Sequence, residues 1–369
     1  GQTTGNTINA GQADTANTID SSGDGSSGVT HIQENNGSAN VLNLGTNVAA
    51  IQSQGPNDQI EAVAEVGSGD PQGSPGLLSE ENNIGSESGT RENTVDNSYT
   101  DATGVTGVQQ NNGHANAIGT SHAISGLSGA PSTDTGDEGP DLSQTATATG
   151  KTARNSGPGT DDPPGENEDQ LAIVSGQDRD NSVTDTAFNQ FQGVATVQQN
   201  NGDGNVMGAS TAVTGFTGGD RDVGSLDQDV TAEGVVEDTP ANGIRDNGSS
   251  RRNEMVDSGA NVSGITTVQQ NNGTSNAIMA ATAVMGQAPN LVDGSGQPDD
   301  AKNPGSLDQN VQARGQLGLD GSQDGVDPLT GVQATDGGSE RQNAIFDNSF
   351  DGSTGVVTVQ ENNGDANTV

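Results

Sequence analysis

The sequence predicts an all-β repeat protein: a β-solenoid-like stack of five units with long acidic loops. Three observations support this prediction. One motif occurs five times, short segments alternate apolar and polar residues, and acidic residues gather in the connections between these segments. Self-similarity at a long period is typical of stacked structural units. Alternation with a period of two is typical of half-buried β-strands, and no segment shows helical spacing of comparable quality.

The composition excludes an ordinary globular core. The 369 residues include 50 Asp and Glu against 11 Lys and Arg, the formal net charge is −39, and 27% of the residues are hydrophobic. Such values are also typical of disordered chains, and the repeats are the observation against that alternative. The negative charge disfavours nucleic acid and anionic membranes as partners. No apolar stretch reaches the roughly 20 residues of a membrane-spanning helix, so membrane insertion is not expected.

The repeated motif combines a strand with a turn. It begins with Gly, continues through Gln-Gln or Gln-Glu to Asn-Asn-Gly, and ends at a further Asn; its copies start at Gly28, Gly104, Gly193, Gly264 and Gly355. Because Asn and Gly tolerate positive φ, Asn-Asn-Gly predicts a turn. The sequence leaves open whether this turn is a corner between stacked strands or a tight hairpin in an antiparallel sheet.

Four strand-like segments recur in step with this motif. They are an Asn-led segment, the motif strand, an alternating tail and a Leu-x-Gln segment. In the tail after the fourth motif, Ile278 and Val284 share one face while Ala277 and Ala283 share the other. The predicted divisions are an N-terminal strand-like segment at 1–16, repeat units at 17–92, 93–180, 181–252 and 253–342, and a partial fifth unit at 343–369.

The Gln and Asn side chains of the motif are predicted to stack between units as hydrogen-bonded ladders. Such ladders stabilise stacked strands about 4.8 Å apart. The alternative is that these residues only form turns, but a turn alone does not require the two glutamines. The ladder and turn residues of the three central units are Gln109, Gln110, Asn111, Asn112, Gly113, Asn116, Gln198, Gln199, Asn200, Asn201, Gly202, Asn205, Gln269, Gln270, Asn271, Asn272, Gly273 and Asn276.

Two acidic clusters offer the hard oxygen ligands that calcium prefers. They contain Asp134, Asp137, Glu138, Asp178, Asp180 and Asp185. The alternative is that they are solvated loop residues, because no EF-hand or tandem nonapeptide calcium motif accompanies them. Apart from calcium, the sequence suggests no cofactor.

Catalytic chemistry finds little support in the sequence. The three histidines, His31, His114 and His122, occupy different repeat positions, and no base recurs beside a nucleophile, so we expect no enzyme. The absence of cysteine excludes disulfides and thiol catalysis.

At Gly113-His-Ala-Asn116-Ala-Ile118 and Gly273-Thr-Ser-Asn276-Ala-Ile278 the chain resembles the curlin-type repeats of bacterial extracellular amyloid fibres. In that family a Gln is followed by Gly-x-x-Asn-x-Ala, and the strands stack as a β-solenoid. Here the inserted Asn-Asn lengthens the spacing from Gln to Gly, and the repeat period is several times longer. The resemblance therefore covers only the motif in each unit.

The repeats and this resemblance imply a structural subunit of a secreted, extracellular fibre or biofilm matrix that polymerises head to tail by β-strand stacking. The sequence ends at Thr368-Val369 within a third strand, and the strand-like Thr7-Ile8 segment is expected to complete that unit in the next copy. The first alternative is a monomeric acidic adhesin or surface-layer module, with calcium binding as an optional property. An ice- or crystal-binding surface is weaker, because regular Thr-x-Thr rows are missing.

Overall fold

The computed structural model describes residues 2–4, 7–8, 14–53, 59–66, 77–80, 83–84, 89–129, 141–153, 173–175, 177–217, 226–238, 244–246, 249–288, 307–319, 334–336, 340–346, 349–365, 367 and 369. Within these ranges every regular element is a β-strand. The same ranges therefore contain no helix with the length and apolar character needed to cross a membrane.

Four long sheets make up the described fold, and we name them A to D in the order in which each repeat unit visits them. Sheet A contains β3 (Thr15–Asp20), β9 (Thr90–Asp96), β14 (Asp178–Thr184), β19 (Ser250–Val256) and β24 (Glu340–Phe346). Sheet B contains the motif strands β4 (Ser27–Asn35), β10 (Thr103–Asn111), β15 (Gln192–Asn200), β20 (Ser263–Asn271) and β25 (Thr354–Asn362).

Sheet C contains β5 (Val41–Ser53), β11 (Ala117–Gly129), β16 (Val206–Thr217) and β21 (Ala277–Ala288). Sheet D contains β1 (Gln2–Thr4), β6 (Gln59–Val66), β7 (Leu77–Glu80), β12 (Asp141–Ala153), β17 (Leu226–Asp238) and β22 (Leu307–Leu319). Two small sheets contain the short strands that follow sheet D and precede sheet A along the chain. They are β2 (Thr7–Ile8) with β8 (Asn83–Ile84), and β13 (Ile173–Ser175) with β18 (Ile244–Asp246) and β23 (Ala334–Asp336).

All pairings in the long sheets are parallel, and each strand pairs with its equivalent one unit later. Gly104 of β10, for example, pairs with Gly28 of β4 and Gly193 of β15. The predicted all-β architecture of stacked parallel strands is confirmed. The hairpin alternative is wrong, because Asn-Asn-Gly joins strands of two different sheets.

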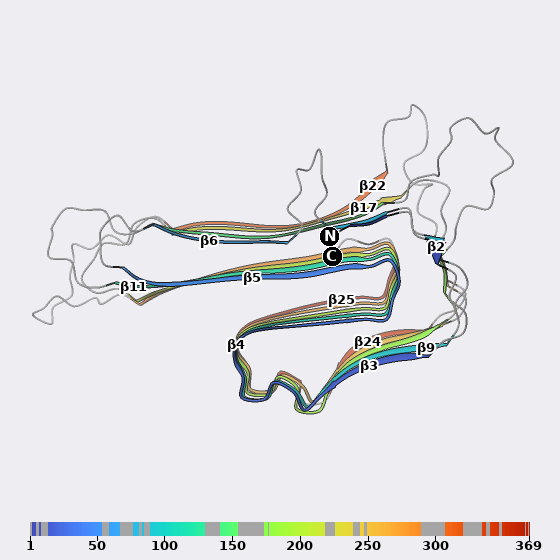
Figure 1. Ribbon diagram of the computed structural model, residues 1–369, viewed down its shortest axis with the longest axis horizontal. Coiled ribbons are helices and arrows are strands. Elements are labelled where there is room, and N and C mark those ends of the chain that lie inside the picture. Colours follow the sequence, from blue (N-terminus) through green and yellow to red (C-terminus); the bar gives the residue numbers. More distant parts are fainter. Residues whose placement is uncertain are drawn as a thin grey trace, which may run out of the picture.

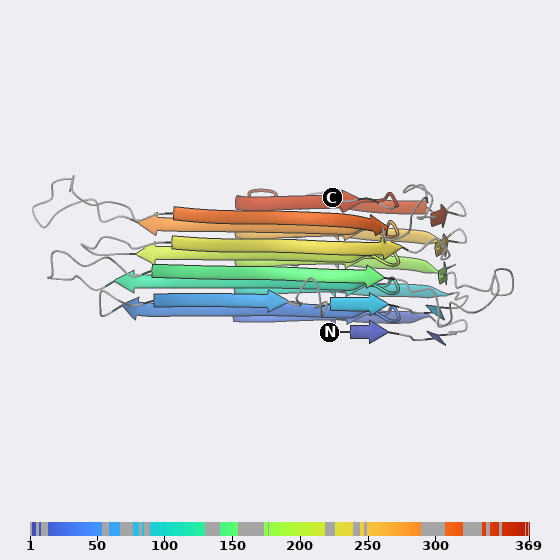
Figure 2. The ribbon, with the colours of Figure 1, turned by 90° about the horizontal axis from the view of Figure 1, so that it is seen from above.

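The four sheets lie on one another as layers in the order A, B, C, D. Figure 1 looks along the stack, so the equivalent strands overlie one another. Figure 2 shows the same strands rising in sequence order from the N-terminal unit to the C-terminal unit. We call the set of strands that one unit contributes a rung; the N-terminal and C-terminal rungs form the two end faces of the stack.

The turn between sheets B and C begins at Asn-Asn-Gly, but its positive φ lies elsewhere. The residues that adopt it are those just before the final Asn of the motif: Ala39, Ala115, Gly204 and Ser275, with φ between 54° and 66°. Positive φ is also found at the first glycine of the motif. At Gly104, φ is 124°, and a Cβ there would lie 2.0 Å from the carbonyl oxygen of Gly28 in the rung below. Glycine is therefore required at this position by both conformation and space.

Apolar side chains fill the spaces between sheets. Between A and B, Val95, Val108, Val183 and Val197 form one cluster with the aromatic rings of the A–B turns, including Phe188. Sheet C uses both faces, as the alternation predicts. Its Thr120 bonds to Gln198 of sheet B, whereas its small residue Ser121 bonds to a backbone carbonyl of sheet D.

Two structural features were not predicted: an additional short strand in the repeat units and the pairing partners of the N-terminal strands. The short fifth strand of each unit, such as β13, is too brief to show alternation in the sequence. The segment at 1–16 contributes β1 and β2, which pair with β7 and β8 and so add part of a rung below the first unit.

Candidate functional site

The first glutamine of each motif forms a continuous column between sheets B and C. Each side-chain amide donates to the Oε1 of the next rung, from Gln33 through Gln109, Gln198 and Gln269 to Gln360, with N···O distances of 2.8–3.0 Å. Gln109, Gln198 and Gln269 are fully buried. Their Nε2 groups also reach backbone carbonyls of sheet C, at Asn43, Gly119 and Gly208. The column therefore joins neighbouring rungs and neighbouring sheets.

The second glutamine faces the opposite way, toward sheet A. Gln270 donates to Gln199 at 2.7 Å, Gln199 to Gln110 at 2.9 Å, and Gln110 to Glu34 at 2.7 Å. All donors of this column point toward the N-terminal rung. The position is occupied by glutamate at both ends, as Glu34 and Glu361. We call these five side chains the Gln110 column.

The second asparagine of Asn-Asn-Gly interlocks with the leading asparagine of sheet A. Asn181 accepts hydrogen bonds from Asn93 and Asn112 and donates to Asn201 and Asn253, at 2.9–3.0 Å. The same pattern repeats around Asn93 and Asn253, and Asn343 ends the ladder by accepting from Asn253 and Asn272 and donating to backbone carbonyls. Two asparagines from segments about 20 positions apart thus form one zigzag ladder, and Asn93, Asn181 and Asn253 are fully buried.

The first asparagine and the last asparagine of the motif hold the B–C turn closed. Asn205 donates to Asn200 Oδ1 within its rung at 3.1 Å and to the carbonyl of Gly273 in the next rung at 3.0 Å. Asn200 in turn donates to Asn111 Oδ1 at 2.8 Å. The rungs approach so closely that a Cβ on Gly202 would lie 1.7 Å from the carbonyl oxygen of Gly273. The equivalent hydrogen bonds run from Asn116 to Asn111 Oδ1 and to the carbonyl of Gly202, and from Asn276 to Asn271 Oδ1 and to the carbonyl of Gly364.

A column of arginines, which was not predicted from the sequence, lies beside the asparagine zigzag. Arg91, Arg179, Arg251 and Arg341 pair in register in sheet A, each two residues before the leading asparagine. Arg91, Arg179 and Arg251 have exposed fractions of 5%, 1% and 0%, although arginine is seldom fully buried without a partner. The recurring Arg-x-Asn pattern was the signal that could have revealed them.

Carboxylates and carbonyls compensate these buried cations. The carboxylate of Asp203 forms ion pairs with Arg179 at 2.8 Å and with Arg251 at 3.2 Å. Its Oδ1 also accepts a hydrogen bond from the backbone N–H of His114 at 2.8 Å. Arg341 pairs with Asp365 at 2.7 Å, and Arg91 contacts His114 and the carbonyl of Asn112. Burial alone would raise the pKa of Asp203, but the charges of Arg179 and Arg251 outweigh it and hold that pKa well below its usual range.

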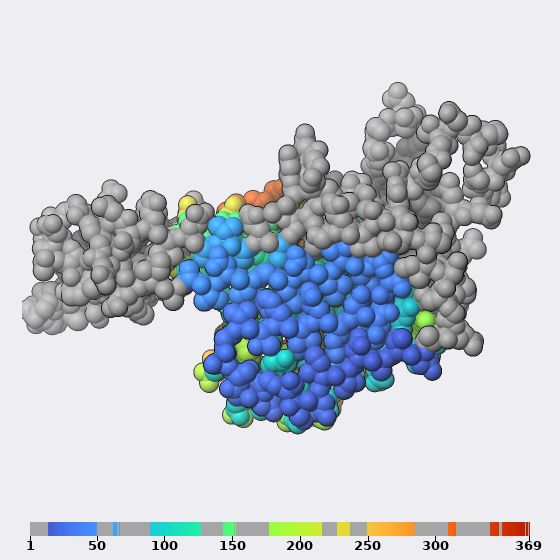
Figure 3. Space-filling view, viewed as in Figure 1, coloured from blue at the N-terminus to red at the C-terminus, as the bar shows by residue number. Residues whose placement is uncertain are grey.

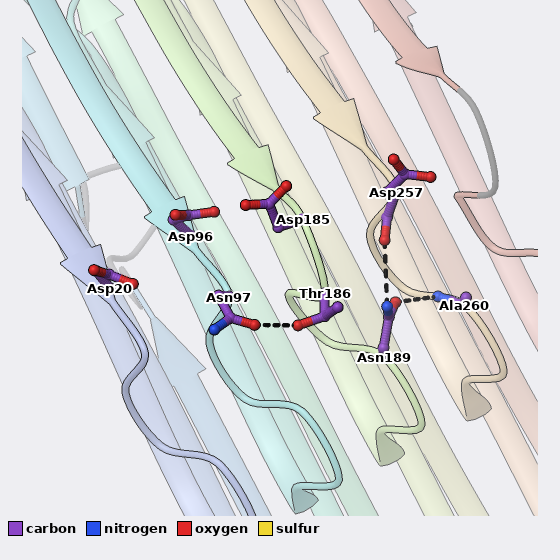
Figure 4. Close-up of a pocket in the computed structure, with 8 residues that line it drawn as sticks. All are labelled: Asp20, Asp96, Asn97, Asp185, Thr186, Asn189, Asp257 and Ala260. Atoms are coloured by element: carbon purple, nitrogen blue, oxygen red, sulfur yellow. Dashed lines mark hydrogen bonds between the residues drawn. The ribbon is translucent and has the colours of Figure 1, made fainter.

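An acidic row runs along the beginning of the A–B turns, across successive rungs. Figure 4 shows Asp20, Asp96, Asp185 and Asp257 side by side in a cavity of about 650 Å³. A hydrogen bond with Asp96 and the nearby carboxylate charges raise the pKa of Asp185. Within the described residues, however, no cluster of three or more acidic or histidine side chains has metal-binding geometry.

The residues proposed for calcium are separated in the structure. Asp178 accepts the backbone N–H of Ser250 at 2.8 Å, and Asp180 pairs with Arg252 at 2.5 Å, whereas Asp185 lies in the acidic row. Asp134, Asp137 and Glu138 lie outside the described residues.

His114 and His122 are buried, whereas His31 is exposed on the outermost strand β4. His122 is fully buried and contacts the hydroxyls of Thr46 and Thr196, and burial lowers its pKa to about 3. It is therefore neutral at physiological pH. Its ring centroid lies 6.5 Å from that of His31, whose pKa burial also lowers.

Comparisons with protein families, curated proteins and solved structures gave no match. Chemically, the described site is a set of buried polar columns whose members bond to copies of themselves. What it can do is bind one rung to the next with a fixed register.

Proposed function

We propose that the chain is the structural subunit of a secreted extracellular fibre or biofilm matrix. In this proposal the rungs continue a β-solenoid from one copy into the next, head to tail, and the chain is not an enzyme. The observation that carries the proposal is that the outermost strands carry the same kinds of side chains and the same open backbone edges that interior strands use to bind their neighbours.

Apolar side chains that are buried inside the stack are exposed at its ends. Val105, Val194 and Ile265 have exposed fractions of 5%, whereas Val29 and Val356, at the two ends of the same column, have 50% and 40%. In the described part of the chain, the exposed large hydrophobic residues all lie on outermost strands or at the last residue: Val29, Val48, Val311, Phe346, Val356, Val357, Val359 and Val369. Figure 3 looks onto the N-terminal face, drawn in blue.

Each end face also presents an open strand edge. β4 and β25 are the outer strands of sheet B, and β3 and β24 are those of sheet A. Open edges normally carry features that block further pairing, because they template association with another chain. A contact between two different faces forms a filament when no rotation closes it into a ring, and continuation of the rungs along one stacking direction is such a contact.

Substitutions on the two end faces test this proposal. We expect Val29→Asp or Val356→Asp to reduce filament elongation at least about tenfold, because a carboxylate would be buried without a partner. Electron microscopy and light scattering measure the effect. An equimolar mixture of the two variants should stop at dimers, since each variant retains one good face.

Ser143→Asp is the matched control for these variants. Ser143 is exposed on an interior strand, and its neighbour in the next rung is already Asp227. It should assemble like the wild type. Filaments of normal length from both valine variants would contradict end-to-end stacking.

The acidic row is the observation behind the second candidate function, a monomeric acidic surface module or adhesin, and added salts separate the two functions. Under our proposal, calcium and sodium at matched ionic strength should promote assembly to a similar extent by screening the charge of −39, with a Debye length of about 8 Å at physiological ionic strength. Sedimentation and thermal unfolding measure this. A monomer that micromolar calcium stabilises, where sodium does not, would favour the alternative function.

A further inference from the structure

At each end of the Gln110 column a buried oxygen atom lacks a hydrogen-bond partner, and a protonated glutamate could supply the missing donor. Its donors all point toward the N-terminal rung, so each Oε1 needs a donor from the rung above. Gln270 Oε1 is buried and has no hydrogen-bond partner among the described residues, because the side chain above it is Glu361. Glu34 Oε1, at the other end, is likewise buried and without a partner.

Continuing sheet B into a second copy brings these two ends together. The register that pairs Gln270 with Glu361 and Glu34 with Gln110 would place Glu361 of one copy beside Glu34 of the next. Neighbouring strands lie about 4.8 Å apart, so the two carboxylates would be adjacent in the column. A charged glutamate donates no hydrogen bond, whereas a protonated one donates through its O–H in place of the N–H that an interior glutamine uses.

On the basis of the proposed head-to-tail fibre, we infer that Glu34 and Glu361 form a proton-controlled junction between copies of this chain. When Glu34 carries a proton, it donates to Glu361 of the copy below, and a proton on Glu361 satisfies Gln270. When both are charged, two carboxylates face each other in a desolvated column and the copies separate.

The electrostatics of Glu34 place this transition in an accessible pH range. Burial raises the pKa of Glu34 to about 7, although the hydrogen bond from Gln110 opposes the rise. A second carboxylate at the junction would raise it further. Since the joined state then has the higher pKa, joining takes up protons, is favoured at low pH and weakens as the pH rises above about 7.

Other ionisable groups lie near the two ends of the column. Tyr99, in the A–B turn, has its pKa raised by burial and by the charge of Glu34. Arg91 of sheet A contacts His114 and Asn112, and Arg341 pairs with Asp365. His31 lies on the opposite face of β4, against Thr46 of sheet C, and is the competing titratable group in this rung.

The test is filament elongation between about pH 5.5 and 8.5, for the wild type and for the double variant Glu34→Gln/Glu361→Gln. We expect wild-type elongation to fall roughly tenfold for each pH unit above about 7. The double variant replaces both acids with permanent donors, so it should elongate at pH 8.5 as fast as the wild type does at low pH. The control Glu92→Gln/Glu233→Gln removes the same charge from outward-facing positions on interior strands and should keep the wild-type profile.

Each outcome has a distinct meaning. If the Glu34/Glu361 double variant keeps the wild-type pH dependence, another group such as His31 is responsible and the junction is overturned. If the control also loses its pH dependence, net charge is responsible and the junction is again overturned. If no chain forms filaments at any pH, the proposed fibre function fails, and the inference fails with it.

Discussion

Asp203→Asn is expected to destabilise the chain by about 3–5 kcal/mol, the usual cost of removing one partner from a buried ion pair. Asp203 is fully buried between Arg179 and Arg251, and the change would leave both guanidinium groups without their counter-charge. Asparagine keeps the shape and one acceptor oxygen, so the loss reports charge rather than packing. Chemical denaturation of unassembled chain at neutral pH measures the free energy of unfolding.

The pH dependence of this difference has a defined sign. The folded-state pKa of Asp203 is lowered relative to an unfolded value of about 3.9. Its stabilising contribution is therefore complete above about pH 4 and is lost as the pH falls toward the folded-state pKa. The difference between wild type and variant should be constant from pH 5 to 8 and shrink in more acidic solution.

Asp180→Asn is the matched control. Asp180 pairs with Arg252, but these side chains are 28% and 46% exposed. Solvent-exposed pairs of this kind contribute about 0–1 kcal/mol. Equal losses for the two variants would show that Asp203 does not compensate a buried charge cluster.

Replacing Gln269 and Asn271 together by alanine is the second change with a large expected effect. Gln269 bonds to Gln198 and Gln360 at 2.8 Å, and Asn271 bonds to Asn200 at 2.9 Å and accepts from Asn276 at 3.1 Å. Each buried partner left without a hydrogen bond costs about 1–3 kcal/mol. We therefore expect a loss of several kcal/mol, visible as a lower melting temperature in circular dichroism.

Asn310→Ala/Gln312→Ala provides the control with the same residue types. On the exposed face of β22, Gln312 donates to Asn310, and Asn310 donates to Asp229 of β17. Exposed substitutions usually change stability by no more than about 0.5 kcal/mol. Similar, small effects from both pairs of changes would reject a structural role for the ladders.

Much of the rung could be predicted because its signals are local. Alternation in segments such as that around Gln228, Val230 and Asp229 located the strand and assigned its buried and exposed faces. The spacing of the five motifs matches the pairing of Gly104 with Gly28 and Gly193. Repetition of the two glutamines suggested ladders, and the structure places those side chains in two hydrogen-bonded columns.

The sequence did not reveal how the columns are oriented. Gln109 and Gln110 are adjacent, yet one faces sheet C and the other sheet A, and only the layering of the sheets assigns them. Likewise, Asn-Asn-Gly marks the turn, but the backbone places the positive φ at residues such as Ala115, where it fits the path between two sheets. Local preference marks a turn without fixing its conformation.

The sequence by itself determined the repeat, the strand positions and the polar identity of the stacked residues, because each is encoded within a few neighbouring positions. Only the tertiary structure decided that Arg179 and Arg251 are buried against Asp203, and that Glu34 ends a column of glutamines. These relations join residues 24 to 76 positions apart. They arise from the packing of sheets and rungs, which brings charges and amides into a dry interior where each one requires a partner.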